Sequence, residues 1–181
     1  MKLLYIWVCG RTEKEFIDKL FTENPDKIKQ AISSKHTNNK KKKLPFYQYY
    51  KHSEKGIFIH VRKSGYIYMQ APTQEILRNL IIRYKMKVKH TKYVYSIALN
   101  KEIDKYTTRN NILRDKNSKC KVFAKRKRMI DIDYDGKLRL QVFKKTLKIS
   151  TTLENAEDEM QEFAKHFIQK YAVAKLKKGW D

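Results

Sequence analysis

The chain has 181 residues, with 42 Lys and Arg against 19 Asp and Glu, so its formal net charge is +23. Hydrophobic residues make up 41% and aromatic residues 12%, which is enough for a packed core and excludes global disorder. No apolar run approaches the roughly 20 residues that cross a bilayer, and the apolar start lacks the cleavage site of a signal peptide. The two cysteines, Cys9 and Cys120, have no zinc-site spacing. We therefore expect an intracellular protein, without a membrane span, a metal or another cofactor.

The pattern at the start of the chain predicts a strand and then a helix. Residues 3–8 form an apolar run rich in β-forming residues, and Gly10 ends it. Thr12, with Glu15 three positions later, has the spacing of a capping box. Apolar residues then recur at helical spacing over residues 16–21.

The next stretch predicts a short helix, a basic loop and three strands. Ile28 and Ile32 have a helical spacing after the break at residues 24–25. Residues 33–43 are polar, end in four lysines and predict a mobile loop. Strands are expected over residues 46–50, 57–61 and 66–71, the last two with the alternation of half-buried strands. Thr73 is expected to cap the first long helix.

The second half of the chain repeats this order. A strand over residues 93–99 precedes a short helix that Asn100 is expected to cap. Residues 122–123 start a short strand, and three strands and a long helix follow, so each half reads strand, helix, three strands, long helix; the last helix opens with acidic residues that suit its positive end. The strands are expected at residues 122–123, 129–134, 137–143 and 147–151, and the helix from residue 152 onward.

The Asp135-Gly136 turn fixes which residues share a face of this sheet. A three-residue loop pairs Tyr134 with Leu138 and places apolar residues of both strands on one face. The opposite face then carries Met129, Asp131, Asp133, Arg139, Gln141 and Phe143. The apolar face must be covered, and two long helices are available to cover it, so the polar, basic and aromatic face is expected to stay open.

The repeated order and two segments resemble the TATA-binding protein family. The segment Ser-Gly-Tyr-Ile-Tyr-Met-Gln-Ala at residues 64–71 is similar to that family's Ser-Gly-Lys strand before its long helix. The segment Phe-Lys-Lys-Thr-Leu-Lys-Ile-Ser at residues 143–150 is similar to the equivalent strand of the second half. The resemblance implies an α+β saddle of two pseudo-repeats, residues 1–89 and 90–181. In that saddle, one curved antiparallel sheet carries two long helices on one face. The Lys, Ile, Asn and Tyr bias suggests a distant, viral member or one from an AT-rich genome, acting in the nucleus or at a viral replication site.

The family kinks DNA by wedging two pairs of phenylalanines into the minor groove. Phe46 and Phe143 match one wedge of each pair by position. The positions of their partners fall near Arg62 and Arg126, where this chain departs from the family pattern. That departure puts TATA-specific kinking in doubt.

The expected nucleic-acid contacts are of two kinds. Basic clusters would contact phosphates, the alternative being solubilising loops; they are Lys40, Lys41, Lys42, Lys43, Lys125, Arg126, Lys127 and Arg128. Side chains of the open face would stack on or wedge between bases, the alternative being ordinary core or strand residues. These are Phe46, Phe58, Arg62, Tyr66, Tyr68, Arg139, Gln141 and Phe143.

Three functions follow from these expectations. The first is a non-enzymatic transcription initiation factor that binds duplex DNA and recruits a general transcription factor or RNA polymerase. The second is a structural RNA-binding protein, for example of a ribosome. The third is a metal-dependent nuclease built on Asp131, Asp133 and Glu154. Against the third, Asp133 faces Arg139 across the strands as a simple ion pair.

Overall fold

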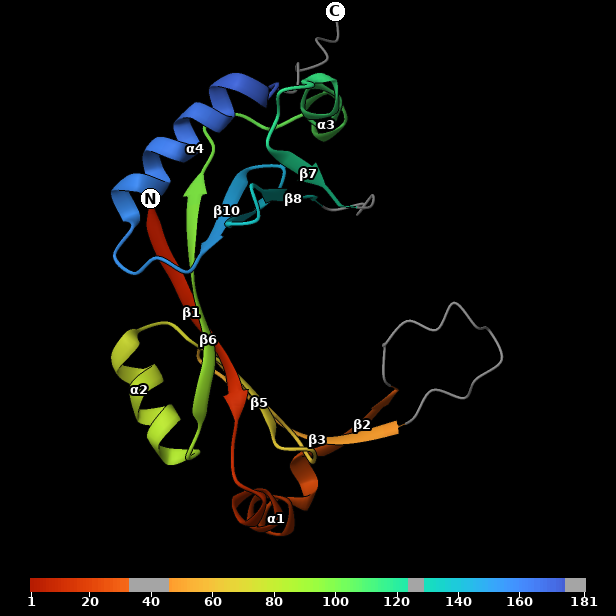
Figure 1. Ribbon diagram of the computed structural model, residues 1–181, viewed down its shortest axis with the longest axis vertical. Helices are drawn as coiled ribbons and strands as arrows, with labels where there is room; N and C mark the ends of the chain where they lie inside the picture. The colour runs from red at the N-terminus through yellow and green to blue at the C-terminus, as the bar shows by residue number, and fades with distance from the viewer. Residues whose placement is uncertain (33–45, 124–128, 175–181) are drawn as a thin grey trace, which may run out of the picture. The chain divides into compact units, whose positions relative to one another are not determined.

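The computed structural model describes residues 1–32, 46–123 and 129–174, which form an α+β fold (Figure 1). Two sets of elements follow one another along the chain, each with a strand, a helix, four strands and a helix. The first set is β1 (Lys2–Arg11), α1 (Lys14–Glu23), the short 3₁₀ turn η1 (Pro25–Lys27), β2 (Ile28–Ile32), β3 (Phe46–Glu54), β4 (Ile57–Arg62), β5 (Tyr66–Ala71) and α2 (Gln74–Arg83). The second set is β6 (Lys87–Ala98), α3 (Lys105–Arg114), β7 (Cys120–Val122), β8 (Ile130–Tyr134), β9 (Leu138–Val142), β10 (Thr146–Thr151) and α4 (Glu157–Tyr171).

The ten strands of the described residues form one open antiparallel sheet, in the order β2-β3-β4-β5-β1-β6-β10-β9-β8-β7. Read from either end, this order takes the second, third, fourth, fifth and then first strand of a set. The two sets therefore enter the sheet by the same path, as expected of two structural repeats.

The chain divides into two compact units. The N-terminal unit is residues Tyr5–Thr91, and the C-terminal unit combines Met1–Leu4 with Lys92–Asp181. The first four residues thus belong to the later unit, where the amino group of Met1 donates a hydrogen bond to Oε1 of Gln161 at 2.8 Å.

The core of the N-terminal unit lies between its strands and its two helices (Figure 1). Alternate residues of the central strands are fully buried, including Val61 of β4 and Ile67 of β5. Ile17 of α1 and Leu77 of α2 are buried as well. The ring of Tyr84, just after α2, packs against the rings of Phe16 and Tyr50, with distances between ring centroids of 5.6 Å and 6.5 Å. Both helices therefore pack against the same face of the strands.

The C-terminal unit is built in the same way, with α4 against the apolar face of its strands. Buried residues of this face include Ile132, Leu140 and Ile149. The ring of Phe163 in α4 meets Tyr134 of β8 edge-on at 4.8 Å. At the start of α4, the backbone N–H of Ala156 donates to the Tyr95 hydroxyl at 3.2 Å.

Several sequence predictions are confirmed in detail. The strands predicted at residues 57–61 and 66–71 are β4 (Ile57–Arg62) and β5, and Thr73 caps α2 by accepting a hydrogen bond from the N–H of Ile76 at 3.3 Å. The predicted pairing of β8 with β9 is also observed, including Tyr134 opposite Leu138.

Two predicted helix features are wrong. Residues 28–32 are strand β2, because the backbone of this segment pairs with β3, where Ile28 lies opposite Tyr50. Thr12 caps no helix: its hydroxyl donates to the carbonyl of Tyr84 at 2.7 Å, and Glu13 occupies the N-cap position of α1 without a side-chain hydrogen bond.

The starts of the second-half helices also differ from prediction. The first begins at Lys105 rather than near Asn100, because Asp104 accepts hydrogen bonds from the N–H groups of Tyr106 and Thr107 and caps it. The second, α4, begins at Glu157 rather than near residue 152.

Two predicted basic segments cannot be placed. The basic loop over residues 33–43 and the cluster at residues 125–128 lie outside the described residues.

Within the described residues, every helix is too short or too polar to serve as a bilayer span.

Candidate nucleic-acid interface

The strands of the N-terminal unit turn a second set of side chains away from α1 and α2. Successive residues of a strand point to opposite faces, and the strand pairing keeps the set together across β1, β2, β3, β4 and β5. We call this surface the aromatic face. Its side chains are Tyr5, Trp7, Cys9, Arg11, Lys29, Ala31, Tyr47, Tyr49, Lys51, Ser53, Phe58, His60, Arg62, Tyr66, Tyr68 and Gln70.

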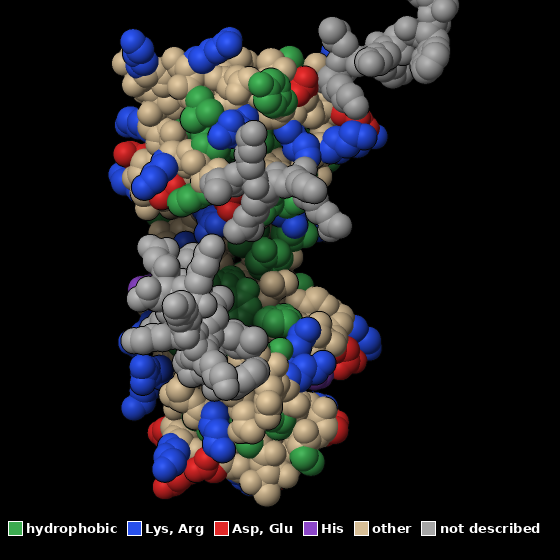
Figure 2. All heavy atoms as spheres, turned by 90° about the vertical axis from the view of Figure 1, so that its right-hand side faces the viewer, with side chains coloured by type: hydrophobic (Ala, Val, Ile, Leu, Met, Phe, Trp, Pro, Cys, Tyr) green, Lys and Arg blue, Asp and Glu red, His purple; other side chains and the backbone are tan. Residues whose placement is uncertain are grey.

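The aromatic face carries cations and no carboxylate. Among the residues that the described strands of this unit place on it, Arg11, Lys29, Lys51 and Arg62 are basic and none is Asp or Glu. Figure 2 shows part of the molecule from this side, with green apolar and aromatic side chains next to blue Lys and Arg. Such a surface is complementary to a polyanion with flat, stackable groups.

One group of rings on this face surrounds Arg62. Its guanidinium lies over two tyrosine rings, with Cζ 4.6 Å from the ring centroid of Tyr47 and 5.3 Å from that of Tyr66. The imidazole of His60 is stacked on Tyr49 at 4.4 Å with an interplanar angle of 19°. These rings come from β3, β4 and β5, so strand pairing rather than a loop holds them in position.

A second group of rings surrounds Tyr68. Its ring meets Trp7 edge-on at 5.2 Å and Phe58 edge-on at 5.7 Å. The Nζ of Lys51 lies 5.7 Å from the Phe58 ring. Each ring pair or cation–ring pair contributes roughly 0.5–1.5 kcal/mol, so the two groups hold this surface in a defined arrangement.

Burial favours the neutral forms of three side chains on the aromatic face: His60, Tyr66 and Tyr68. Desolvation raises the pKa of Tyr68 to about 12, with Tyr5 and Tyr66 adding to the effect. The pKa of Tyr66 is also raised, first by desolvation and then by its hydrogen bond with Cys9. The pKa of His60 is lowered by desolvation and by the charges of Arg62 and Lys51. The hydroxyls therefore remain available as donors, and the imidazole is an uncharged ring near neutral pH.

Two buried nitrogens of this face lack a hydrogen-bond partner within the described structure: Nε2 of His60 and Nε of Arg62. Leaving a buried polar group unsatisfied costs about 1–3 kcal/mol. A cavity of about 600 Å³ adjoins Arg62 and is lined also by Gln30, Tyr47, Gln48, Lys63 and Ser64.

The open face of the C-terminal unit has a different character. Asp131 of β8 is buried, and its carboxylate accepts two hydrogen bonds from the guanidinium of Arg139, at 2.9 Å and 2.6 Å. The expected pairing of Arg139 with Asp133 is therefore wrong, since the Asp133 carboxylate accepts from the N–H of Gly136 instead. The bidentate contact neutralises Arg139, whose guanidinium also lies 5.4 Å from the ring of Phe123.

Of the residues predicted to contact nucleic acid, four lie together on the aromatic face: Phe58, Arg62, Tyr66 and Tyr68. Arg139 and Gln141 point to the open face of the C-terminal unit, opposite Asp133 and Asp131 in register. Phe143 follows β9, with the Nζ of Lys148 5.4 Å from its ring.

The remaining predicted residues are placed only in part or not at all. Phe46 is the first residue of β3, opposite Ile32, and the placement of its side chain lies outside the description. Lys40, Lys41, Lys42, Lys43, Lys125, Arg126, Lys127 and Arg128 lie outside the described residues.

The sequence predictions omitted Trp7, Tyr47, Tyr49 and His60 as contacts. The run Phe-Tyr-Gln-Tyr-Tyr at residues 46–50 has no clear alternation, so its faces follow only from pairing with β4, where Tyr49 lies opposite Arg62. For His60 a signal was present, because it alternates with the buried Ile59 and Val61.

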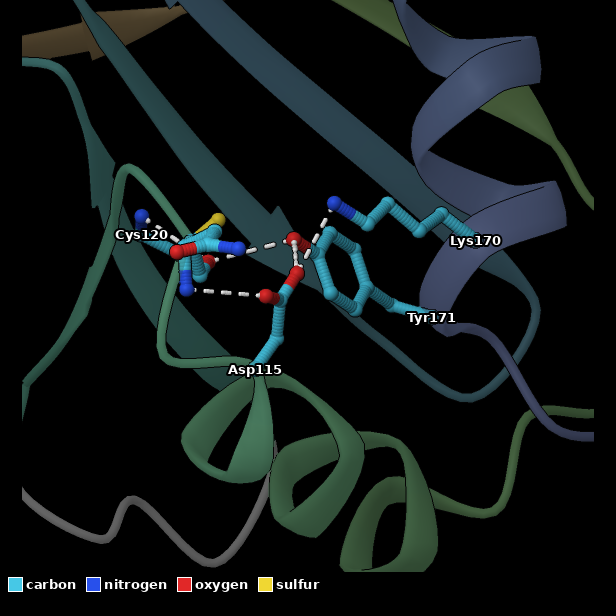
Figure 3. Close-up of polar contacts among 6 residues, drawn as sticks. Asp115, Cys120, Lys170 and Tyr171 are labelled. Atoms are coloured by element: carbon cyan, nitrogen blue, oxygen red, sulfur yellow. Dashed lines mark hydrogen bonds and ion pairs between the residues drawn. The ribbon is translucent and has the colours of Figure 1, made fainter.

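A separate polar cluster joins the end of α3 to the end of α4 (Figure 3). The Asp115 carboxylate accepts from the Tyr171 hydroxyl at 2.7 Å and pairs with Nζ of Lys170 at 2.8 Å. These contacts lower the pKa of Asp115 and raise that of Lys170, while burial raises the pKa of the Cys120 thiol. Because Asp115 and Lys170 are already paired and the Cys120 thiol stays protonated, the cluster serves to hold the ends of α3 and α4 together.

No group of three or more His, Cys, Asp or Glu side chains in the described part of the chain is arranged to hold a metal ion. The chain matches no model of a known protein family and no curated protein.

Proposed function

We propose that this chain is a transcription initiation factor of the TATA-binding-protein type, which binds duplex DNA through the open side of its sheet. The proposal includes the finer fold: two similar halves that form one curved sheet with long helices on its other side. The symmetric strand order and the repeated strand, helix, four strands, helix sequence support this fold, because two copies of one structural unit joined in one sheet produce such an order.

The observation that carries the functional proposal is the aromatic face, a sheet surface with rings and cations and without carboxylates. A strand surface that approaches DNA must tolerate phosphate and offer apolar side chains to the bases. Asp131 is the unfavourable feature on the other unit, and its bidentate contact with Arg139 removes its net charge from the surface. The helical side of the sheet is left for a general transcription factor or RNA polymerase.

DNA bending tests the proposal. Phe46 and Phe143 are the proposed wedges, and each would unstack one base step at a cost of a few kcal/mol that wrapped contacts recover. Easily unstacked TA steps would be preferred. In a short AT-rich duplex with a dye at each end, the parent protein should raise energy transfer, and Phe46→Ala or Phe143→Ala should each raise it less. Leu113→Ala, at an exposed position of α3, serves as control. A parent protein that binds without changing energy transfer contradicts the wedge mechanism.

A structural RNA-binding role is the second candidate. The observation in its favour is the stacking of His60 on Tyr49, because aromatic sheets commonly recognise unpaired bases of RNA loops. Footprinting on AT-rich duplex and on structured RNA of equal length separates the two: protection of the RNA alone would replace the first proposal with the second.

A further inference from the structure

We infer that the aromatic face of the N-terminal unit binds unpaired bases by stacking, so that this unit takes a single-stranded or locally opened segment of nucleic acid. The inference rests on the proposed function only in assuming a nucleic-acid ligand, and it names a ligand class that the duplex proposal does not contain. The shared chemistry is an unpaired base next to a phosphate, from DNA or from RNA.

The first support is the orientation of the rings. His60 and Tyr49 are nearly parallel, at 19°, and Tyr47 is within 22° of the same imidazole plane, 6.4 Å away. Tyr47 and Tyr49 are tilted by 41° from each other, so the imidazole of His60 is the ring to which both are nearly parallel. Aromatic rings held on paired strands are a surface on which bases stack, whatever their sequence. A wedge that enters between base steps needs a protruding apolar side chain rather than a ring already stacked on its neighbours.

The second support is the protonation of the face. Because the pKa of His60 is lowered, its imidazole is neutral near pH 7, and Tyr66 and Tyr68, whose pKa values are raised, are neutral there as well. Neutral rings stack on neutral bases without desolvating a charge, while Arg11, Lys29 and Lys51 stand on the same face to meet the phosphates.

The third support is a pair of unsatisfied nitrogens among the rings. Nε2 of His60 and Nε of Arg62 lack partners in the described structure, and an open pocket of about 600 Å³ adjoins Arg62 and Tyr47, with Gln30 and Gln48 of the opposite face at its rim. A base has hydrogen-bonding groups on its edges. A base that displaces the ring of Tyr47 can form a hydrogen bond with one of these two nitrogens. That hydrogen bond offsets part of the free energy needed to separate Tyr47 from its neighbours.

An oligonucleotide with and without bases tests the inference. The probes are a dye-labelled oligothymidylate of about a dozen nucleotides and an abasic strand of the same length, which keeps the phosphates and lacks the rings. By fluorescence anisotropy at one salt concentration, the oligothymidylate should bind the full chain at least about tenfold more tightly. Equal affinities would overturn the inference, because they would leave only phosphate contacts. An oligouridylate of the same length distinguishes the sources, since tighter binding than oligothymidylate assigns the site to RNA and the reverse to DNA.

Matched variants locate the effect. Tyr49→Leu removes the ring stacked on His60 and should remove most of the difference between the two probes. Tyr106→Leu removes a ring that is 70% exposed on α3 of the C-terminal unit and should leave the difference unchanged. If Tyr49→Leu keeps the full difference, the bases are bound elsewhere and the inference is wrong.

A spectroscopic readout makes the test independent of the folding of any face variant. Trp7 lies on the aromatic face and the other tryptophan is Trp180, so in a Trp180→Phe protein the tryptophan emission reports Trp7. Oligothymidylate should quench this emission and the abasic strand should not; no quenching by either contradicts the inference.

Duplex binding measured in parallel separates the two proposals. If the protein binds duplex DNA and has equal affinity for the two single-stranded probes, the stacking inference is wrong and the duplex proposal stands. If it prefers the strand with bases and does not bind duplex DNA, the duplex proposal is wrong and the stacking inference stands.

Discussion

His60 illustrates how one side chain on an open sheet face can link stability to pH. Its pKa is lowered by desolvation, by Arg62 and by Lys51, so the unfolded chain takes up a proton more readily than the folded protein does. A group with a depressed basic pKa therefore destabilises the fold as the pH falls through its ordinary value near 6.5. Above that range both states are neutral at this site and the effect is absent.

We predict that His60→Gln flattens the pH dependence of stability between pH 7.5 and 5.5. Glutamine takes up no proton in this range, so the loss of stability on acidification should be smaller than in the parent protein. The measurement is the urea midpoint at each pH, with His166→Gln on the exposed side of α4 as control. An identical pH dependence in parent and variant would show that the environment of His60 does not disfavour its protonation.

Residue type alone could not separate the two open faces. Arg62 and Arg139 occupy similar places in the sequence pattern, and both were expected to contact nucleic acid. Arg62 lies over two tyrosine rings, whereas Arg139 is committed to the buried carboxylate of Asp131. Strand register alone points to Asp133 as the partner of Arg139, because the two residues lie directly opposite each other. The Arg139 side chain instead reaches diagonally to Asp131 on the neighbouring strand.

At the scale of elements, sequence prediction succeeded where local signals agreed with pairing. Alternation fixed β4 and β5, and the Asp135-Gly136 turn fixed the register of β8 and β9 because both residues adopt positive φ, +54° and +68°. It failed at β2, where the spacing of Ile28 and Ile32 fits a helix equally well. Only the backbone of β3, brought alongside by the fold, makes this segment a strand.

The close approach of β1 to the start of β6 requires a residue without a side chain at position 10. A Cβ at Gly10 would lie 2.0 Å from the carbonyl oxygen of Lys87, a backbone atom that cannot turn away. We predict that Gly10→Ala lowers the free energy of unfolding by about 3 kcal/mol or prevents folding, because the strands must separate to accept it.

Gly136→Ala is the matched comparison. It has no atom within 4 Å of the added Cβ but has a φ of +68°, so it should cost only about 1–2 kcal/mol for the left-handed backbone. Urea unfolding of both variants measures the difference, and equal losses would contradict the steric account of Gly10.

For the molecule as a whole, the net charge of +23 governs how binding responds to salt. Each neutralised phosphate of duplex DNA releases counterions, so the logarithm of affinity falls with the logarithm of salt concentration by about 0.9 per contact. We predict that replacing Lys40, Lys41, Lys42 and Lys43 with Ala lowers the affinity equally for all sequences and makes this slope less steep.

The matched control for that experiment changes lysines on the helical side of the sheet. Lys14→Ala with Lys19→Ala on α1 removes exposed charges and should leave the salt slope nearly unchanged. If the four-lysine variant keeps the parent slope, those lysines contact no phosphate and act only as solubilising charges.

The assignment of Met1–Leu4 to the C-terminal unit has a consequence for dissecting this protein. A single cut after Thr91 does not give two self-sufficient pieces: the piece from Lys92 lacks its first strand segment, and the other carries four residues that belong to its neighbour. A tag fused ahead of Met1 would likewise alter the C-terminal unit, because the amino group of Met1 donates its hydrogen bond to Gln161 of that unit. Complementation between co-expressed pieces, or a circular permutant that rejoins these four residues to the later unit, is the sound way to study either unit by itself.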